Sequence, residues 1–122
     1  MKEITMEFAK QFAAAWVSDW NSHDLEKILL HYADDFVMES PLAAKRFPET
    51  RGTVISKANV RAYWANGLQL NPDLSFELLD VLCGVGYVTI YYRNKSTDRR
   101  VVEVLHFNDA GLVDRAMSNY SE

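Results

Sequence analysis

The sequence contains one cysteine, Cys83, and this scarcity excludes an intrachain disulfide. No group of cysteines and histidines has the spacing of a zinc site, so we expect no metal and no cofactor. Long apolar runs are also lacking. The N-terminal stretch "MKEITMEFAKQF" is charged and amphipathic, which predicts neither a signal peptide nor a membrane span. We therefore expect a soluble, cytoplasmic protein with no membrane partner.

Runs of basic residues are equally scarce. The chain has 13 Lys and Arg against 17 Asp and Glu, a formal net charge of -4, and the doublet Arg99 and Arg100 is too short for a nucleic-acid footprint. What the chain does have is 48% hydrophobic residues in a length of 122. These values predict a single domain over residues 1–122 with one sizeable core and no nucleic-acid partner.

The first part of the chain has the periodicity of helices. Apolar residues recur at steps of three and four, which predicts a helix over residues 3–20 with one buried stripe. The break "NSHD" offers good capping residues. A short second helix follows, ended by Asp34 and Asp35, and its apolar residues are Leu25, Ile28, Leu29 and Tyr32.

A strand and a loop separate this helix from a third one. Alternation in "FVMES" predicts a half-buried strand over residues 36–40, before Pro41. Two prolines, a glycine and mixed charges in "PLAAKRFPETRGTVI" predict a mobile loop over an opening. Ser56 can cap a third helix, and Asn66 with Gly67 gives it a left-handed end.

The second half is typical of strands. Stretches rich in Val, Ile, Tyr and Phe are broken by "CGVG", "NKSTD" and "NDAG", which predicts four antiparallel strands over residues 74–83, 87–94, 99–107 and 112–120. Helices followed by a meander predict an α+β domain, with helices laid over one face of a curved sheet. Large residues at the outer positions of these strands would need a second cover, so we expect a homodimer.

Three stretches together resemble a known family. "HDLEKILLHYADDFVMESP", "SKANVRAYWANGL" and "VVEVLHFNDAGLVDRAMSNYSE" are similar to the ketosteroid isomerase and SnoaL-like branch of the nuclear transport factor 2-like (NTF2-like, cystatin-like) superfamily. The resemblance implies a cone: a curved antiparallel sheet wraps a cavity, three N-terminal helices cover it, and a small, mostly apolar ligand enters. The fold hosts many reactions, so it does not by itself imply one.

The resemblance also assigns positions inside the cavity. The base of ketosteroid isomerases falls on Ser40, whose hydroxyl is too weak a base to take a proton from carbon unaided. The oxyanion tyrosine falls on Trp16, which can donate a hydrogen bond but cannot act as an acid. The aspartic acid that completes the oxyanion hole falls on Glu103. Supporting tyrosines fall on Tyr32, which keeps its hydroxyl, and on Trp64.

Glu103 is also the best candidate without the resemblance. It lies among four apolar residues in "VVEVL", where an inward carboxyl would stay protonated or need a cation. The alternative is a surface acid paired with Arg99 or Arg115. His106 is three residues away, so alternation places it on the opposite face from Glu103 and excludes a simple dyad.

Ser40 and Glu39 compete for the functional position at the strand end. Alternation places Phe36, Met38 and Ser40 on one face and Glu39 on the other, so we expect Ser40 in the cavity and Glu39 at the surface. A bulge would be needed to turn Glu39 inward.

Aromatic residues could line a ligand pocket or fill a core. For each one alone a core position is the commoner explanation, but their excess in the helices and the last strand favours a pocket. We expect ligand-binding positions at Trp16, Trp20, Tyr32, Met38, Trp64 and Tyr120, and candidate catalytic positions at Glu103 and Ser40.

Two classes of function follow. The first is a SnoaL-like protein that binds a mostly apolar ligand carrying a polar group, and loss of the base at Ser40 favours this class over steroid isomerisation. The second is an isomerase, cyclase or dehydratase that uses Glu103 for acid–base or oxyanion chemistry. A protein-interaction module would need an exposed apolar patch that the sequence does not identify.

Overall fold

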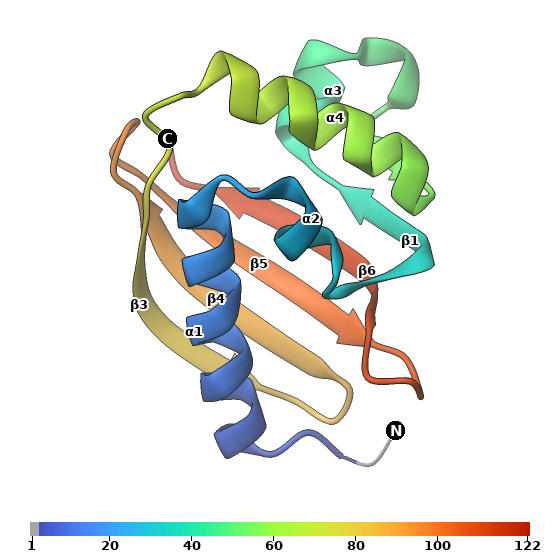
Figure 1. Ribbon diagram of the computed structural model, residues 1–122, viewed down its shortest axis with the longest axis vertical. Helices are drawn as coiled ribbons and strands as arrows, with labels where there is room; N and C mark the ends of the chain where they lie inside the picture. The colour runs from blue at the N-terminus through green and yellow to red at the C-terminus, as the bar shows by residue number, and fades with distance from the viewer. Residues whose placement is uncertain (1–2) are drawn as a thin grey trace.

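The computed structural model describes residues 3–122 (Figure 1). The α-helices and the short 3-10 helix η1 are α1 (Met6–Ser22), α2 (Leu25–Leu29), α3 (Pro41–Arg46), η1 (Pro48–Thr50) and α4 (Lys57–Leu70). The strands are β1 (Tyr32–Glu39), β2 (Thr53–Ile55), β3 (Phe76–Cys83), β4 (Tyr87–Asn94), β5 (Arg99–Phe107) and β6 (Val113–Tyr120). The predicted α+β class and the four strands of the second half are confirmed, with end points shifted by at most two residues.

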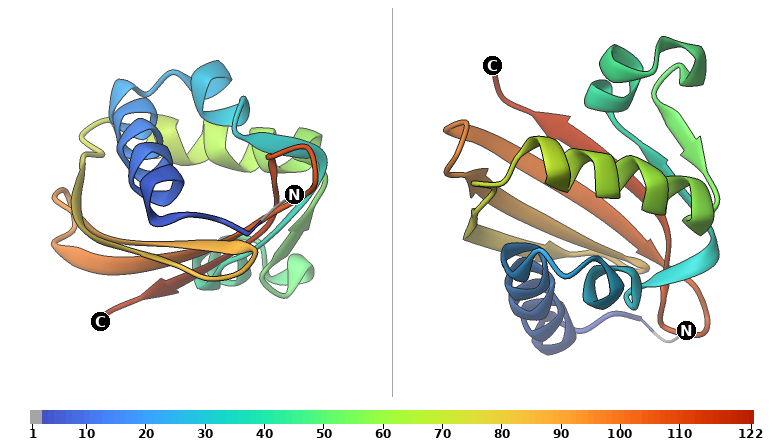
Figure 2. Two further views of the ribbon diagram at one scale, coloured as in Figure 1. Left: turned by 90° about the horizontal axis from the view of Figure 1, so that it is seen from below. Right: turned by 45° about the horizontal axis from the view of Figure 1, so that its top comes forward.

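All six strands form one curved sheet, in the order β2-β1-β6-β5-β4-β3. It bends around α1 and α4, and α1, α2 and α4 lie on its concave side (Figure 2). The expectation of a purely antiparallel sheet was wrong at one place, because β1 and β6 are parallel. The hairpins of the meander fix the direction of β6, and β1 joins its free edge running the same way.

Helix α1 closes one side of the cone. The Thr5 side chain caps its start by accepting a hydrogen bond from the Phe8 N–H at 3.1 Å. Ala9 and Ala13 are fully buried and let the helix lie close to the sheet, which directs Trp16 and Trp20 into the interior.

The segment between α2 and α4 departs most from the prediction. Residues 32–35 belong to β1 and do not end a helix, because Tyr32 pairs with Val113 of β6. The predicted loop over 41–55 is instead α3, η1 and the edge strand β2. Pro41 occupies the first position of α3, where a missing N–H costs nothing, so this proline starts a helix.

Helix α4 passes through Asn66 and Gly67 and ends at Leu70, so the predicted stop was wrong. Both residues stay helical because Leu68, one residue later, packs against the core. The Asn66 side chain also accepts a hydrogen bond from Arg46 of α3. Tertiary packing overrides the turn preference of the pair.

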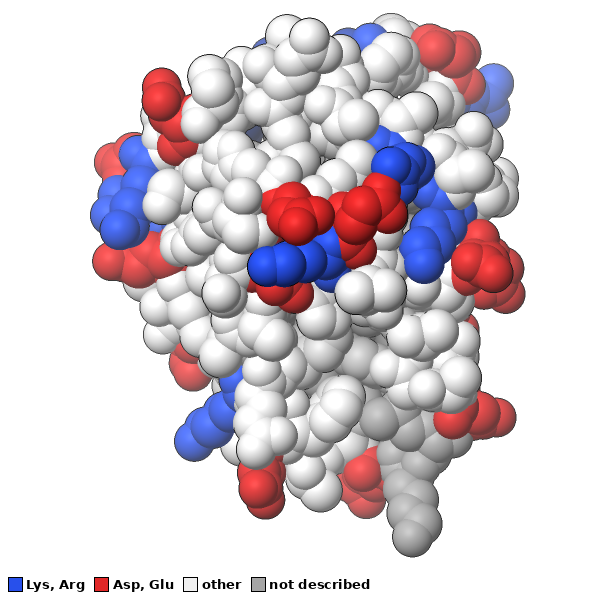
Figure 3. All heavy atoms as spheres, viewed as in Figure 1, with Lys and Arg blue, Asp and Glu red and all other residues white. Residues whose placement is uncertain are grey.

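The two faces of the molecule differ. On the helical side, acidic and basic side chains lie close together without a large area of one sign (Figure 3). On the outer face of the sheet, Leu82, Tyr87 and Met117 are 52%, 41% and 37% exposed. Within residues 3–122, no helix is long and apolar enough to cross a membrane.

Candidate functional site

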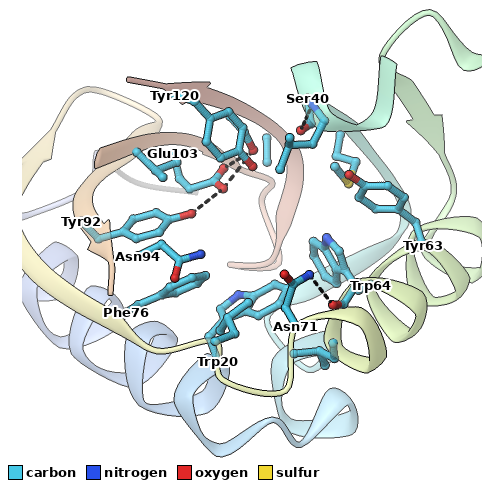
Figure 4. A pocket seen from close by; sticks show the side chains of 18 of the residues that line it. Trp20, Ser40, Tyr63, Trp64, Asn71, Phe76, Tyr92, Asn94, Glu103 and Tyr120 are labelled. Carbon is cyan, nitrogen blue, oxygen red and sulfur yellow. Dashed lines mark hydrogen bonds between the residues drawn. The ribbon is translucent and has the colours of Figure 1, made fainter. Parts of the chain in front are cut away.

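A cavity of about 160 Å³ lies between the concave face of the sheet, α1 and α4 (Figure 4). Its volume compares with an engineered apolar cavity of about 150 Å³ that binds benzene. The structure brings the eight predicted site residues into the lining of this one cavity, and they are Trp16, Trp20, Tyr32, Met38, Ser40, Trp64, Glu103 and Tyr120. Ser40 directly follows β1, and the other seven come from α1, β1, α4, β5 and β6, so only the folded chain assembles them.

Glu103 lies deep in the cavity and is 8% exposed. The Tyr92 hydroxyl donates to its carboxyl at 3.2 Å, and the Ser118 hydroxyl lies 2.9 Å from both carboxyl oxygens. Figure 4 shows Glu103 and Tyr92 side by side on the sheet wall of the cavity. The alternative of a surface acid paired with an arginine was wrong, because odd-numbered residues of β5 face inward.

The environment of Glu103 alters its acidity. Burial raises its pKa from 4.5 to about 7, and the hydrogen bonds from Ser118 and Tyr92 only partly oppose this shift. Near neutral pH the carboxyl is therefore divided between a neutral form, which can donate a hydrogen bond, and an ionised form, which can accept a proton. The sequence did not predict the two hydrogen-bond partners of this carboxyl, Tyr92 and Ser118.

Tyr32 and Trp16 form a second polar group in the cavity. The Trp16 indole N–H donates to the Tyr32 hydroxyl oxygen at 2.8 Å, in a buried position. Trp16 is therefore engaged by a protein partner, which differs from the expectation that it donates to a ligand. The Tyr32 hydroxyl proton has no acceptor among the residues that the structure describes. Burial raises the pKa of Tyr32 well above its ordinary value, so this proton is retained near neutral pH.

Trp20 supplies an unused donor. Its indole nitrogen is buried and has no hydrogen-bond partner within the described part of the chain. It lies near enough to Tyr32 to lower the pKa of that hydroxyl, but the two atoms lack hydrogen-bond geometry. A buried donor without a partner is costly, and an oxygen of a bound molecule would remove that cost.

Ser40 faces the cavity as alternation predicts, while Glu39 is exposed. Ser40 follows β1 and caps α3, since its hydroxyl oxygen accepts from the Leu42 N–H at 3.2 Å. Its hydroxyl also lies near Tyr63 and Tyr120. Burial raises the pKa of Tyr120 to about 12 and that of Tyr63 above its ordinary value, and Ser40 partly offsets both shifts. Ser40 is thus a capping and polar lining residue.

The signal for Tyr92 was present in the sequence of β4. Val88 and Ile90 are fully buried and Tyr92 continues their alternation, whereas Tyr91 lies on the outer face opposite Val102. Sequence alone did not fix the pairing that places Tyr92 next to Glu103.

The histidines lie apart from the cavity lining. His106 lies on the outer face of the sheet, opposite to Glu103, as alternation predicted. Its Nδ1 lies 2.6 Å from an Asp114 carboxyl oxygen. His31 contacts Asp19 at 2.7 Å, and His23 ends α1 in a left-handed conformation.

Comparison with known proteins agrees with this architecture. A SnoaL-like protein of unknown function from Burkholderia thailandensis is 41% identical, covers 99% of this chain and 100% of its own, and superposes with a TM-score of 0.95. A proposed isomerase of the SnoaL-like family from Agrobacterium tumefaciens is 17% identical, over 96% and 100% of the two chains, with a TM-score of 0.77. AclR, a proposed hydroxylase from Streptomyces galilaeus, is 23% identical, over 96% and 91%, with a TM-score of 0.72.

The last two likenesses show the fold alone. Among curated proteins, none matches the sequence. A family assignment comes from the sequence itself, because the SnoaL-like domain matches over residues 13–115. Together with the 41% identity to the Burkholderia protein, this match shows that the chain belongs to the SnoaL-like family.

Proposed function

We propose that the cavity binds a small, mostly apolar molecule with at least one ring, and that Glu103 hydrogen-bonds an oxygen of that molecule. The observation that carries this proposal is the single carboxyl among the described lining residues, buried in a site lined mainly by aromatic and aliphatic side chains. Burying a carboxyl is costly unless it serves an interaction, and a ligand oxygen supplies one.

The walls favour a flat ring. Trp16 and Phe76 are nearly parallel, with ring centroids 5.8 Å apart, while Trp20 and Trp64 meet edge to face at 5.0 Å. Aromatic side chains pack favourably against ring faces and edges. The buried donors of Tyr32 and Trp20 lie in the same lining, so an oxygen-bearing ring finds both a dry surface and hydrogen bonds.

Naphthalene and 2-naphthol provide a direct test, because they share a ring system and differ by one hydroxyl. Calorimetric titration of the wild type should give tighter binding of 2-naphthol. In Glu103→Leu the difference should fall about twofold to tenfold, since a hydrogen bond between neutral groups contributes roughly 0.5–1.5 kcal/mol. Glu39→Leu removes an exposed carboxyl and is the matched control. Equal loss in both variants would contradict the role of Glu103.

A second candidate is proton-transfer catalysis, as in an isomerase, cyclase or dehydratase. The raised pKa of Glu103, about 7, favours it, because a base or acid works best when its pKa lies near the working pH. Deuterium uptake at the α-carbon of 2-tetralone, followed by NMR, tests this activity. The wild type should accelerate exchange, and Glu103→Gln should lose about a hundredfold or more. If the wild type does not accelerate the exchange, ligand binding is the remaining candidate function.

Steroid isomerisation is not part of the proposal. The resemblance to ketosteroid isomerases puts Ser40 at their base position, and the Ser40 hydroxyl caps α3. A hydroxyl is too weak a base to remove a proton from a steroid carbon unaided. We expect no conversion of a 3-oxo-Δ5-steroid by the unmodified chain, and rapid conversion abolished in Glu103→Gln would contradict this assignment.

A further inference from the structure

Two arginines stand at the rim of the cavity. Arg46 at the end of α3 and Arg99 at the start of β5 are half-buried and belong to its lining. Neither forms an ion pair with any carboxylate among residues 3–122. The only acid in the described lining is Glu103, deep inside and partly neutral. A protein with net charge -4 thus keeps two uncompensated cations at one opening.

Both guanidinium groups are held in place by aromatic rings. Arg46 lies 4.9 Å from the centroid of the Tyr63 ring, and Arg99 lies 5.3 Å from that of Tyr120. Arg99 also donates from Nε to the Ser121 carbonyl oxygen at 3.1 Å. Such stacking orders a guanidinium before a ligand arrives and leaves most of its five N–H donors available.

The two arginines flank the same opening. Tyr63 and Tyr120, on which they stack, both lie near the hydroxyl of Ser40, which affects the acidity of both. Figure 4 shows Ser40 between these two tyrosines along the upper part of the cavity. An anionic group entering here meets a cation from α3 and another from β5, while a ring attached to it lies against the tryptophans.

We propose that the molecule bound in this cavity is an organic anion, with its acidic group between Arg46 and Arg99 and its ring, with a neutral oxygen, directed to Glu103. The inference rests on the proposed function, since it specifies the ligand of the same cavity. The reverse orientation is unfavourable, because an acid beside Glu103 would place two carboxyl groups together in a dry site. Arginine is suited to the rim, since its fork of donors matches a carboxylate.

Two ligands with one ring system test the charge. 2-Naphthol is neutral, and 6-hydroxy-2-naphthoate carries a carboxylate at the end opposite its hydroxyl. Calorimetric titration at pH 7 and low salt should give wild-type affinity at least tenfold higher for 6-hydroxy-2-naphthoate. Since exposed ionic attraction is screened by salt, the advantage should shrink several-fold at 0.5 M NaCl.

Substitutions then locate the anion. Arg46→Gln and Arg99→Gln should each weaken 6-hydroxy-2-naphthoate binding about threefold to tenfold, and should weaken 2-naphthol binding by a smaller factor. Arg100→Gln is the control, because Arg100 is adjacent in sequence but exposed outside the cavity lining. Arg99→Lys keeps the charge and should restore part of the affinity, even if Arg99→Gln proves unstable.

The outcomes separate the two proposals. If 2-naphthol binds but 6-hydroxy-2-naphthoate binds no tighter, the anion assignment is overturned and the ring-binding function stands. If the anion binds tighter and the Arg46 and Arg99 variants behave like Arg100→Gln, the rim assignment is overturned. If neither compound binds the wild type, both proposals fail.

Discussion

Replacing Glu103 with glutamine should change how the stability of this protein depends on pH. In the folded protein, burial raises the pKa of Glu103 from 4.5 to about 7. Between these values the folded chain holds a proton that the unfolded chain releases, so rising pH favours unfolding. The stabilising effect is fully present below about pH 4.5 and is lost as pH rises through about 7.

The magnitude follows from the shift. The rise of the pKa from 4.5 to about 7 corresponds to about 3.5 kcal/mol over the whole pH range, at roughly 1.4 kcal/mol for each pH unit. Glutamine fills nearly the same space and offers Tyr92 an amide oxygen as acceptor, but it does not ionise. The wild type should therefore lose about 2.5 kcal/mol more unfolding free energy than Glu103→Gln between pH 5 and pH 8.5, because the unfolded carboxyl is already mostly ionised at pH 5.

Urea unfolding followed by tryptophan fluorescence measures this difference, since the chain has three tryptophans. Other ionisable groups titrate in both proteins and cancel in the comparison. Glu39→Gln removes an exposed carboxyl instead and should keep the pH dependence of the wild type. Parallel stability curves for the wild type and Glu103→Gln would refute a buried, proton-holding Glu103.

Three further predictions use other parts of the structure. Tyr92→Phe removes a hydrogen bond that lowers the pKa of Glu103, so a carboxyl carbon-13 NMR titration should place that pKa above about 7. Ser40→Ala removes the cap of α3 and should cost about 1 kcal/mol in urea unfolding, whereas no loss would contradict the capping role. We propose a homodimer through the exposed sheet face, so light scattering should give twice the 14.0 kDa chain mass. Val104→Lys with Met117→Lys should return it to one chain; a monomeric wild type would contradict the dimer.

The sequence predicted best where one element dictates its own pattern. Alternation placed Ser40 and Glu39 on opposite faces, with the family resemblance putting Ser40 inward, and alternation in β5 placed Glu103 and His106 on opposite faces. These arguments need no knowledge of neighbours, because a strand turns successive side chains to opposite faces.

The predictions that failed depended on contacts between distant segments. Residues 32–35 form a strand because β6 lies beside them, and the local sequence gives no sign of that pairing. Trp16 was expected to serve a ligand, but its N–H is used by Tyr32, sixteen residues later and on another element. Partners in a hydrogen-bond network become visible only when register and helix placement are known.

The two candidate functions require opposite protonation states of Glu103, so their pH dependence distinguishes them. A binding protein uses the neutral carboxyl as a donor to a ligand oxygen, so its affinity for 2-naphthol should fall as pH rises through about 7. A proton-transfer enzyme uses the ionised carboxyl as base, with Tyr32 retaining its proton to stabilise a developing oxyanion, so its rate should rise through the same pH range. Measuring 2-naphthol affinity and 2-tetralone exchange from pH 5 to pH 9 on one preparation distinguishes the roles. If neither quantity changes near the pKa of Glu103, its carboxyl does not act in the cavity in either way.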